Sequence, residues 1–356
     1  MTDTPADPDT LAAGLHAGRR SSADEVRRLV DAVLAGTVDL DAFGRWLVAL
    51  ADVGETAAEI AGVAAALRAR MLPVPSVGTT AVADTCGTGG DGSGSFNIST
   101  AAAIVVAAAG QPVAKHGNRA VSSRTGSADV LEALGVRIEA GPDVAARCLR
   151  EAGICFCLAP AHHPAMARVG PLRRALGRPT VFNLVGPLCN PAAAAVQVIG
   201  VGRPGVREAV AEAARMLGGS RAVVVSGHVG DEPRAFDEVT LFGPTDVIDV
   251  TPAGLRRHRW TAEDFGLATL PAGRVGDLEV ADAAASAAAI RGVLAGERGP
   301  RRDVVVINAA AVLWAADKAA DLRAARQHAE RAIDSGAATR TLAALVAGSH
   351  GAAAIA

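Results

Sequence analysis

Glycine, aspartate and hydroxyl side chains gather in one short stretch, 84-DTCGTGGDGSGSFNIST-100. Its five glycines expose backbone N–H groups, and it runs directly into the apolar segment 101-AAAIVVAAAG-110, the expected body of a helix. Glycine lets an anion approach the backbone, and the free N–H groups of a helix N-terminus favour negative charge. Further donors are the side chains of Ser95, Asn97, Ser99 and Thr100. We therefore expect phosphate binding here, in preference to a merely flexible loop.

The same stretch contains the pattern G-x-G-x-x-G over 87–92, which alone is a weak sign of dinucleotide binding. A dinucleotide fold requires an acidic residue about 20 positions later, to bind the ribose hydroxyls. Here the next expected strand ends in Lys115-His116, with no acid in that window. A P-loop is excluded because no Gly-Lys-Ser/Thr follows. The pattern therefore indicates phosphate binding but does not identify a particular nucleotide.

A second polar run, 115-KHGNRAVSSRTGSAD-129, follows the next expected strand. Its donors suit phosphate and sugar hydroxyls: Lys115, Asn118, Arg119, Ser122, Ser123 and Ser127. Alone, this run also fits a solvated basic loop. Two such loops after strands of one sheet converge at the strands' C-terminal edge, where open α/β folds bind ligands. We expect both to form one site.

Acidic pairs could supply a metal site. A ligand with two phosphate groups normally arrives with Mg²⁺, which prefers carboxylates, hydroxyls and water. Two pairs, Asp231-Glu232 and Asp237-Glu238, lie in 226-SGHVGDEPRAFDEVTLFGPT-245. Each pair by itself also fits a solvated loop, so the residues alone leave the choice open.

The elements that must position these residues fall into two groups. We expect residues 1–9 to be disordered and 10–72 to form a small helical domain, with Ser22 as an N-cap and Glu25 at capping-box spacing. The stretch 73-PVPSVGTT-80 reads as a linker, and a second helical segment is expected at about 164–190. Residues 80–350 should form a large domain.

In that large domain, short β-rich runs alternate with alanine-rich helices at 129–135, 143–153 and 206–218. The strand candidates are 80–84, 111–115, 154–159, 196–201, 222–227 and 304–309. This alternation predicts an α/β fold with a mostly parallel central sheet, beside the small all-helical domain.

Composition limits the possible functions. The formal charge of −2 gives no basic field for nucleic acid, and the longest apolar run is about half of the ~20 residues that a membrane span requires. The five cysteines are dispersed, and the lone C-x-C at Cys155 and Cys157 lacks a second ligand pair for zinc, so we expect reduced thiols. The acidic start MTDTPADPDT is unlike a signal peptide. These features predict a cytoplasmic protein.

Taken in order, five motifs resemble the signature of the anthranilate phosphoribosyltransferase family over residues 10–348. They are GTGGDG…FNIST, KHGNRAVSS…GSAD, 159-APAHHPAM-166, 182-FNLVGPLCNP-191 and DEVTLFGPT. The resemblance implies the nucleoside phosphorylase/phosphoribosyltransferase fold and a homodimer paired through the helical domain. It implies transfer of phosphoribose from phosphoribosyl diphosphate (PRPP) to the amine of anthranilate, giving N-(5-phosphoribosyl)anthranilate and diphosphate. This is the second step of tryptophan biosynthesis from chorismate.

The resemblance also implies roles for individual residues. Those that would bind PRPP are Gly87, Gly90, Asp91, Ser95, Asn97, Ile98, Ser99, Thr100, Lys115, His116, Gly117, Asn118, Arg119, Ala120, Val121, Ser122, Ser123 and Ser127. Those that would contact anthranilate are Gly87, Asn118, His163, Arg173, Gly186 and Pro187. Two Mg²⁺ ions per site are implied, with Ser99 on one side and Asp237 and Glu238 on the other. No single catalytic residue stands out; Lys115 and Arg173 would assist by charge and position.

Three features depart from the family pattern. His162 stands where the family usually has Tyr, and Pro179 replaces a common Arg. The acidic loop is longer than usual, which keeps Asp231-Glu232 as rival metal ligands. Arg173 also fits a surface helix, and His163 a packing role.

Two other functions share parts of this pattern. Pyrimidine nucleoside phosphorylase has the same architecture, but its Lys-His is followed by Ser-Thr-Gly-Gly, whereas Gly-Asn-Arg follows Lys115-His116 here. A non-catalytic, nucleic-acid-binding relative should lose its acceptor and metal residues and gain basic surface. This chain keeps Asn118, Arg173, Asp237 and Glu238 and is slightly acidic, so the sequence favours the enzyme.

Overall fold

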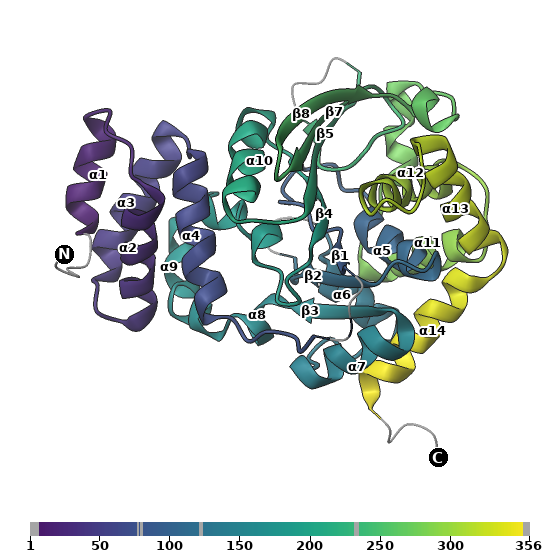
Figure 1. Ribbon diagram of the computed structural model, residues 1–356, viewed down its shortest axis with the longest axis horizontal. Helices are drawn as coiled ribbons and strands as arrows, with labels where there is room; N and C mark the ends of the chain where they lie inside the picture. The colour runs from purple at the N-terminus through teal and green to yellow at the C-terminus, as the bar shows by residue number, and fades with distance from the viewer. Residues whose placement is uncertain (1–6, 77, 79–80, 121–123, 231–234, 352–356) are drawn as a thin grey trace.

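A computed structural model describes residues 7–76, 78, 81–120, 124–230 and 235–351. A small helical part stands beside a larger α/β part, as predicted (Figure 1). None of the described helices is long and apolar enough to cross a membrane. All five cysteines are free thiols, and only Cys86 is not fully buried, which confirms the expectation of unpaired thiols.

The helical part begins with α1 (Pro8–His16), α2 (Ala23–Ala35), α3 (Leu40–Val53) and α4 (Ala57–Arg70). Asp7, Ser22, Asp39 and Thr56 cap these helices by accepting a hydrogen bond from a backbone N–H of the first turn. The capping box of Ser22 and Glu25 is confirmed. The prediction of disorder up to residue 9 was wrong for residues 8 and 9, because the Asp7 cap starts α1 at Pro8; residues 1–6 lie outside the described part.

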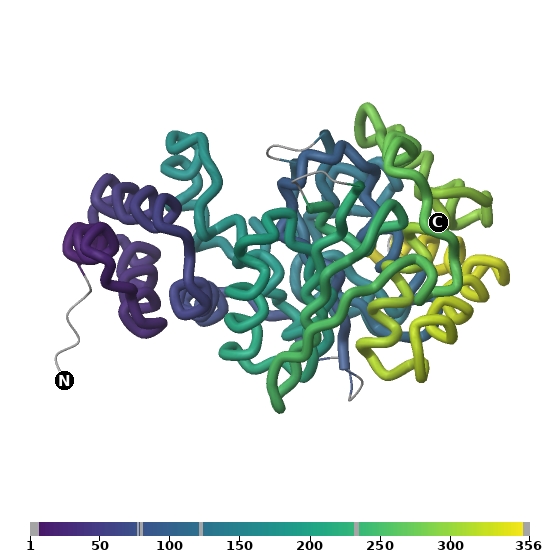
Figure 2. The backbone as a smooth tube through the Cα atoms, turned by 90° about the horizontal axis from the view of Figure 1, so that it is seen from above, coloured from purple at the N-terminus to yellow at the C-terminus, as the bar shows by residue number. Residues whose placement is uncertain are grey.

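A central segment of short helices returns to this bundle (Figure 2). It comprises α8 (Ala159–His162), α9 (Gly170–Leu176) and the 3₁₀ helices η1 (Pro164–Arg168), η2 (Val181–Asn183) and η3 (Gly186–Cys189). α9 packs on α3, while η2 contacts both α3 and α4. These contacts bring residues that are far apart in the chain into one helical cluster.

The sheet has the order β3-β2-β1-β4-β5-β7-β8, with β6 paired to β5. The strands are β1 (Ala83–Asp84), β2 (Val113–Gly117), β3 (Ile154–Leu158), β4 (Val196–Gly200), β5 (Arg221–His228), β6 (Ala235–Phe236), β7 (Thr245–Thr251) and β8 (Gly254–Trp260). Strands β1 to β5 are parallel, and β6 to β8 are antiparallel. The predicted, mostly parallel sheet is confirmed.

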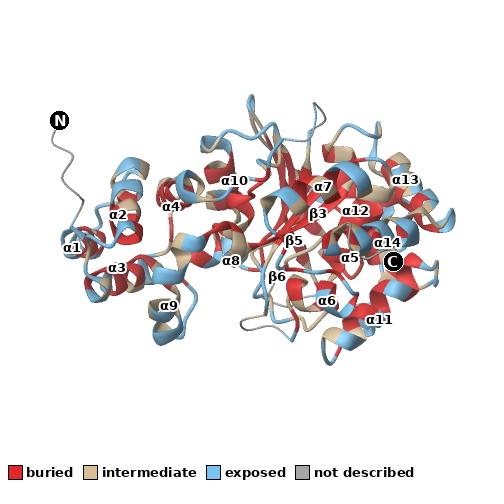
Figure 3. Ribbon diagram, turned by 90° about the horizontal axis from the view of Figure 1, so that it is seen from below, coloured by how far each residue is buried: buried red, intermediate tan, exposed pale blue. Residues whose placement is uncertain are grey.

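Helices cover both faces of the sheet. They are α5 (Ile98–Ala108), α6 (Ser127–Ala133), α7 (Pro142–Ala152), α10 (Arg207–Met216), α11 (Ala283–Leu294), α12 (Pro300–Ala315), α13 (Leu322–Asp334) and α14 (Ala337–His350). The remaining 3₁₀ helices are η4 (Pro204–Val206), η5 (Ala262–Phe265) and η6 (Ala272–Leu278). The strand predicted at 304–309 was wrong: these residues lie inside α12, whose apolar run is buried on all sides (Figure 3).

Two apolar cores meet at the sheet. Val223 and Val225 of β5 join the core formed with α5 and α12, whereas Val224 faces the opposite core. That second core continues without a break through α10 and α4 into the helical bundle. The helical part is therefore packed, through α10, against the face of the sheet that carries Val224.

Candidate active site

The two predicted donor loops leave neighbouring parallel strands at the point where the strand order reverses. β1 has β2 and β3 on one side and β4 and β5 on the other. The glycine-rich stretch follows β1 and ends at α5, and the second polar run follows β2 and ends at α6. Open α/β sheets bind ligands in the crevice at such a switch point.

The glycine-rich loop lies across the end of β4. The Thr88 N–H donates to the Gly200 carbonyl at 2.8 Å. Gly90 has a φ of +77°, which a residue with a side chain rarely adopts. A Cβ on Gly200 would lie 1.6 Å from the Asp237 carbonyl oxygen, so only glycine fits there. β4 thus brings the glycine-rich loop and the acidic loop together.

Asp237 and Glu238 are distant in sequence from the glycine-rich stretch, yet they lie directly against it. Gly89 N–H donates to Asp237 Oδ2 at 2.9 Å, and Ser99 N–H donates to Glu238 Oε1 at 3.1 Å. Asp237 N–H in turn donates to Asp91 Oδ2 at 3.4 Å. A small cavity opens among these groups, lined by Thr85, Ser99, Gly200, Asp237, Glu238 and Asn308.

The electrostatics of this cavity favour a cation. Burial raises the pKa of Asp237 well above its usual value, and the adjacent Asp91 and Glu238 carboxylates add to that rise. Burial also raises the pKa of Glu238 to about 8, although Lys115 opposes the rise. Clustered, buried negative charge of this kind is relieved by a bound cation.

The donor set fits Mg²⁺ shared with a phosphate ligand. Asp237, Glu238 and the Ser99 hydroxyl are oxygen donors, the type that Mg²⁺ prefers. Within the described part of the chain, no three His, Cys, Asp or Glu side chains form a ready protein cage for a metal ion. An ion here would therefore draw several ligands from phosphate oxygens and water, as Mg²⁺ usually does. The rival pair Asp231-Glu232 lies outside the described residues.

Lys115 and His116, at the end of β2, are both buried. Lys115 Nζ donates to the Thr85 carbonyl at 3.2 Å, which places its ammonium beside the glycine-rich loop. His116 Nδ1 is 3.0 Å from the Gly186 carbonyl. Because a carbonyl only accepts, Nδ1 carries the proton, and burial lowers the pKa of His116 to about 3, so that this ring is neutral.

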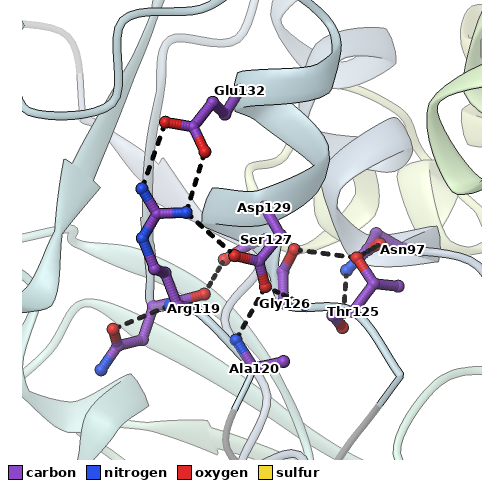
Figure 4. Close-up of polar contacts among 9 residues, drawn as sticks. Asn97, Arg119, Ala120, Thr125, Gly126, Ser127, Asp129 and Glu132 are labelled. Atoms are coloured by element: carbon purple, nitrogen blue, oxygen red, sulfur yellow. Dashed lines mark hydrogen bonds and ion pairs between the residues drawn. The ribbon is translucent and has the colours of Figure 1, made fainter. Parts of the chain in front are cut away.

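The second donor loop is tied to α6 and to the first loop (Figure 4). Arg119 pairs with Glu132 at 2.8 Å and with Asp129 at 3.1 Å. Asp129 also accepts hydrogen bonds from Ala120 N–H and Gly126 N–H, each at 2.9 Å. In this arrangement the Arg119 guanidinium is paired with the acidic side chains of α6, while Asn118 is exposed. Val121, Ser122 and Ser123 lie outside the described residues.

Asn97 joins the two donor loops. Its Oδ1 accepts from Ser286 Oγ of α11 at 2.8 Å and from Thr125 Oγ1 at 3.3 Å. Ser95 forms an isolated bridge with Glu279, and Ser127 begins α6. Ile98 and Thr100 are buried in the first turn of α5. These residues therefore fix the loop backbones beside the crevice.

Of the residues predicted for anthranilate, Gly87 and Asn118 belong to the two donor loops, and the other four lie along the central segment. His163 Nε2 donates to the Cys189 carbonyl at 3.0 Å, and its ring centroid is 5.3 Å from that of His116. Arg173 lies over the Phe182 ring, 5.2 Å from its centroid, and forms no ion pair with any described residue. Burial lowers the pKa of Arg173. Gly186 and Pro187 begin η3, whose first and last carbonyls are the partners of the two histidines.

Comparison with known proteins decides the family. The profile described as "Glycosyl transferase family, a/b domain" matches residues 79–339, and that of its helical bundle domain matches residues 11–71. The anthranilate phosphoribosyltransferase of Roseiflexus sp. (strain RS-1) is 48% identical over 341 residues, covering 94% of this chain and 96% of the relative. That of Moorella thermoacetica is 47% identical, covering 93% and 95%. The chain belongs to the anthranilate phosphoribosyltransferase family.

Solved structures of the anthranilate phosphoribosyltransferase family agree. The enzyme from Thermus thermophilus matches with a TM-score of 0.87 at 40% identity, covering 96% of this chain and 99% of that one. The Saccharomyces cerevisiae enzyme in complex with PRPP and Mg matches with a TM-score of 0.85 at 25% identity, covering 98% and 99%. The predicted family and fold are confirmed.

Several buried polar residues at the site were missed by sequence reasoning. Asp84, at the end of β1, accepts from His116 N–H at 3.2 Å and from Asn190 Nδ2 at 2.7 Å. Asn308 of α12 accepts from Val239 N–H and donates to the Val239 carbonyl, both at 2.9 Å, which holds the acidic loop. The only available signal was a polar residue within an apolar run, as in 304-VVVINAA-310.

The two single-residue departures from the family pattern occupy different surroundings. His162 is buried and its Nδ1 donates to the Leu72 carbonyl at 2.8 Å, tying the central segment to the end of the bundle. Pro179 is exposed on the loop between α9 and η2. His162 is thus a packing residue of the segment that carries His163.

Proposed function

We propose that this protein transfers the 5-phosphoribosyl group of PRPP to the amine of anthranilate, in the tryptophan pathway. The observation that carries the proposal is the contact of Asp237 and Glu238 with the backbone N–H groups of Gly89 and Ser99. It supports the proposal because it brings the acidic pair proposed to hold the metal against the loop proposed to bind phosphate. The family to which the chain belongs performs the reaction named, and a yeast relative binds both PRPP and Mg.

In this proposal the diphosphate lies between the two donor loops. Mg²⁺, when bound by Asp237, Glu238 and Ser99, neutralises charge on the diphosphate and so improves it as a leaving group. We keep two ions per site as the proposed number. Lys115 contributes a buried positive charge beside Thr85, which lines the same small cavity as Asp237 and Glu238. Residues 87–100 and 115–127 bind and orient the phosphates and the ribose.

The chemistry is a substitution at C1 of the ribose. The C1–O bond to diphosphate breaks, a C1–N bond to anthranilate forms, and the amine loses one proton. An aromatic amine is a weak nucleophile, so its placement against C1 matters more than a strong base. Arg173, whose guanidinium has no carboxylate partner among the described residues, would bind the anthranilate carboxylate. We expect inversion at C1.

The wider setting is proposed on the same basis. The helical domain comprises residues 10–72 with the segment 164–190, and the α/β domain comprises 80–350. A homodimer would pair through the helical domain, and the enzyme would act in the cytoplasm without nucleic acid or membrane partners. The dimer follows from the family resemblance, whereas the location and the lack of nucleic-acid or membrane partners follow from the composition of the sequence.

Diphosphate release tests the function directly. Purified protein with PRPP and Mg²⁺ should release diphosphate only when anthranilate is added, in a one-to-one ratio with N-(5-phosphoribosyl)anthranilate measured by mass spectrometry. Release without any acceptor would point to a hydrolase, and cleavage of a pyrimidine nucleoside by orthophosphate would point to a phosphorylase. Asp237→Asn combined with Glu238→Gln should abolish the release, and unchanged release would move the metal site to Asp231-Glu232.

A further inference from the structure

The short helix η3 begins with Gly186 and Pro187, which the family resemblance places beside anthranilate, and it is held through its carbonyl groups. Each of its four carbonyl oxygens accepts a hydrogen bond from a side chain outside η3. In order, Gly186 O accepts from His116, Pro187 O from Gln197, Leu188 O from Arg68 and Cys189 O from His163. A 3₁₀ turn leaves its last carbonyls without backbone partners, so these side chains fix its position.

Two of the four partners, Gln197 and Arg68, lie on β4 and α4. Gln197 is buried on β4, where it pairs with Asp84 in the parallel ladder, and its Nε2 lies 2.5 Å from the Pro187 carbonyl. Arg68 is on α4 of the helical part: its Nε is 2.6 Å from the Leu188 carbonyl and its Nη1 is 3.1 Å from the Leu217 carbonyl. Arg68 therefore links η3 to the helical part and to the end of α10.

The other two partners are His116, predicted to bind PRPP, and His163, predicted to contact anthranilate. Their bonds to Gly186 and Cys189 fix the proton on Nδ1 of His116 and on Nε2 of His163. The remaining ring nitrogens, His116 Nε2 and His163 Nδ1, are buried and have no partner among the described residues. Any displacement of η3 would consequently move Pro187 and both imidazole rings together.

We propose that Gln197 and Arg68 are positioning residues for the aromatic acceptor. They touch neither substrate. They hold η3 in place through its carbonyl groups, so that the surface of η3 and the two imidazole rings fit a flat aromatic acid. This inference rests on the proposed function of the site. The simpler alternative is that both side chains satisfy buried carbonyls and contribute only stability. A positioning role predicts a rise in the KM for anthranilate alone, whereas a role in stability alone predicts no selective change between the KM for anthranilate and the KM for PRPP.

The test compares two buried glutamines. Gln197→Met removes the amide at nearly constant volume, and Gln111→Met is the matched control. Gln111 is buried too and donates to the Ala81 and Pro112 carbonyls, but it lies just before β2, at the opposite end of that strand from the site. Both variants should lose thermal stability. Only Gln197→Met should raise the KM for anthranilate, by about 5- to 10-fold for one buried hydrogen bond, with the KM for PRPP changed by less than about twofold.

Arg68 provides the independent second variant. Arg68→Met should raise the KM for anthranilate selectively, and Arg68→Lys, which keeps the charge and one donor, should recover part of the loss even if Gln197→Met does not fold. Unchanged or equally raised Michaelis constants in the Gln197 and Arg68 variants would overturn the inference, while the wild-type activity would still support the proposed function. A wild-type protein that does not consume anthranilate would overturn both.

Discussion

Removing the amide of Asn308 should weaken the metal site without removing a proposed metal ligand. In Asn308→Leu, Val239 N–H and C=O lose their side-chain partners, and Val239 is only 1% exposed. An unsatisfied buried polar group costs about 1–3 kcal/mol, so the two together cost on the order of 3 kcal/mol after some relaxation. With an unfolding entropy of about 2.1 cal/mol/K per residue, the melting temperature of this chain should fall by roughly 4 °C.

The functional effect should be larger than that loss of stability suggests. Asn308 holds the backbone next to Glu238, and the loss of such an outer partner typically weakens metal binding by about 10- to 100-fold. We expect the Mg²⁺ concentration for half-maximal turnover to rise at least about tenfold, measured by titrating Mg²⁺ at constant PRPP.

Ile307→Ala is the matched control for this prediction. Ile307 is the preceding residue of α12 and is fully buried in the apolar core. Its truncation should cost about 2–5 kcal/mol, as much as the Asn308 change, without touching the acidic loop. A wild-type Mg²⁺ requirement in Asn308→Leu, or an equal rise in Ile307→Ala, would refute the reasoning.

Three further predictions concern the metal, the acceptor and the second donor loop. Glu238→Gln should lower turnover by about 10- to 100-fold at fixed Mg²⁺; turnover within about twofold of wild type would place the metal elsewhere. Arg173→Ala should raise the KM for anthranilate by about 10- to 100-fold, since hydrogen bonds to charged groups are strong, and leave the KM for PRPP unchanged. Arg174→Ala, at the exposed neighbouring residue, is the control and should change neither KM. Equal changes in both KM values in Arg173→Ala would remove Arg173 from the acceptor site. Asp129→Asn should lower the urea midpoint at pH 7 but much less near pH 3, and a pH-independent loss would contradict this.

The sign of the Asp129 effect follows from its pKa. Partial burial opposes ionisation, but hydrogen bonds from Ala120 and Gly126 N–H outweigh it and hold the pKa of Asp129 below its usual value of 3.8. A carboxylate with a lowered folded pKa stabilises the fold above its unfolded pKa. This stabilisation is complete at neutral pH and is lost as the pH falls below about 4. The difference between wild type and variant should therefore shrink only in acid.

Local patterns predicted the donor loops, because each is marked by glycine and hydroxyl residues between a strand and a helix. The N-terminal helices were equally visible, since their caps are short-range features such as Ser22 with Glu25. The segment 304–309 was misread because α12 is buried all round, so its apolar run has neither the two-residue nor the 3.6-residue alternation that separates strand from helix.

Long-range contacts could not be predicted from local pattern. Asn308 reaches Val239 across 69 residues, and Arg68 reaches Leu188 across 120. Such partners are set by the packing of whole elements, and a single buried Asn, Gln or Arg in the sequence does not indicate which carbonyl it will meet. Similarly, β7 joins the sheet through antiparallel pairing to β5, and β8 through antiparallel pairing to β7, which no motif of the site required.

The most direct test of the central claim is the fluorescence of anthranilate after purified protein, PRPP and Mg²⁺ are mixed. We predict a steady fall that stops when either PRPP or Mg²⁺ is omitted and that is absent when Asp237 and Glu238 are neutralised together. Constant fluorescence in the complete mixture, with PRPP still protecting the protein against thermal unfolding, would contradict anthranilate as the acceptor.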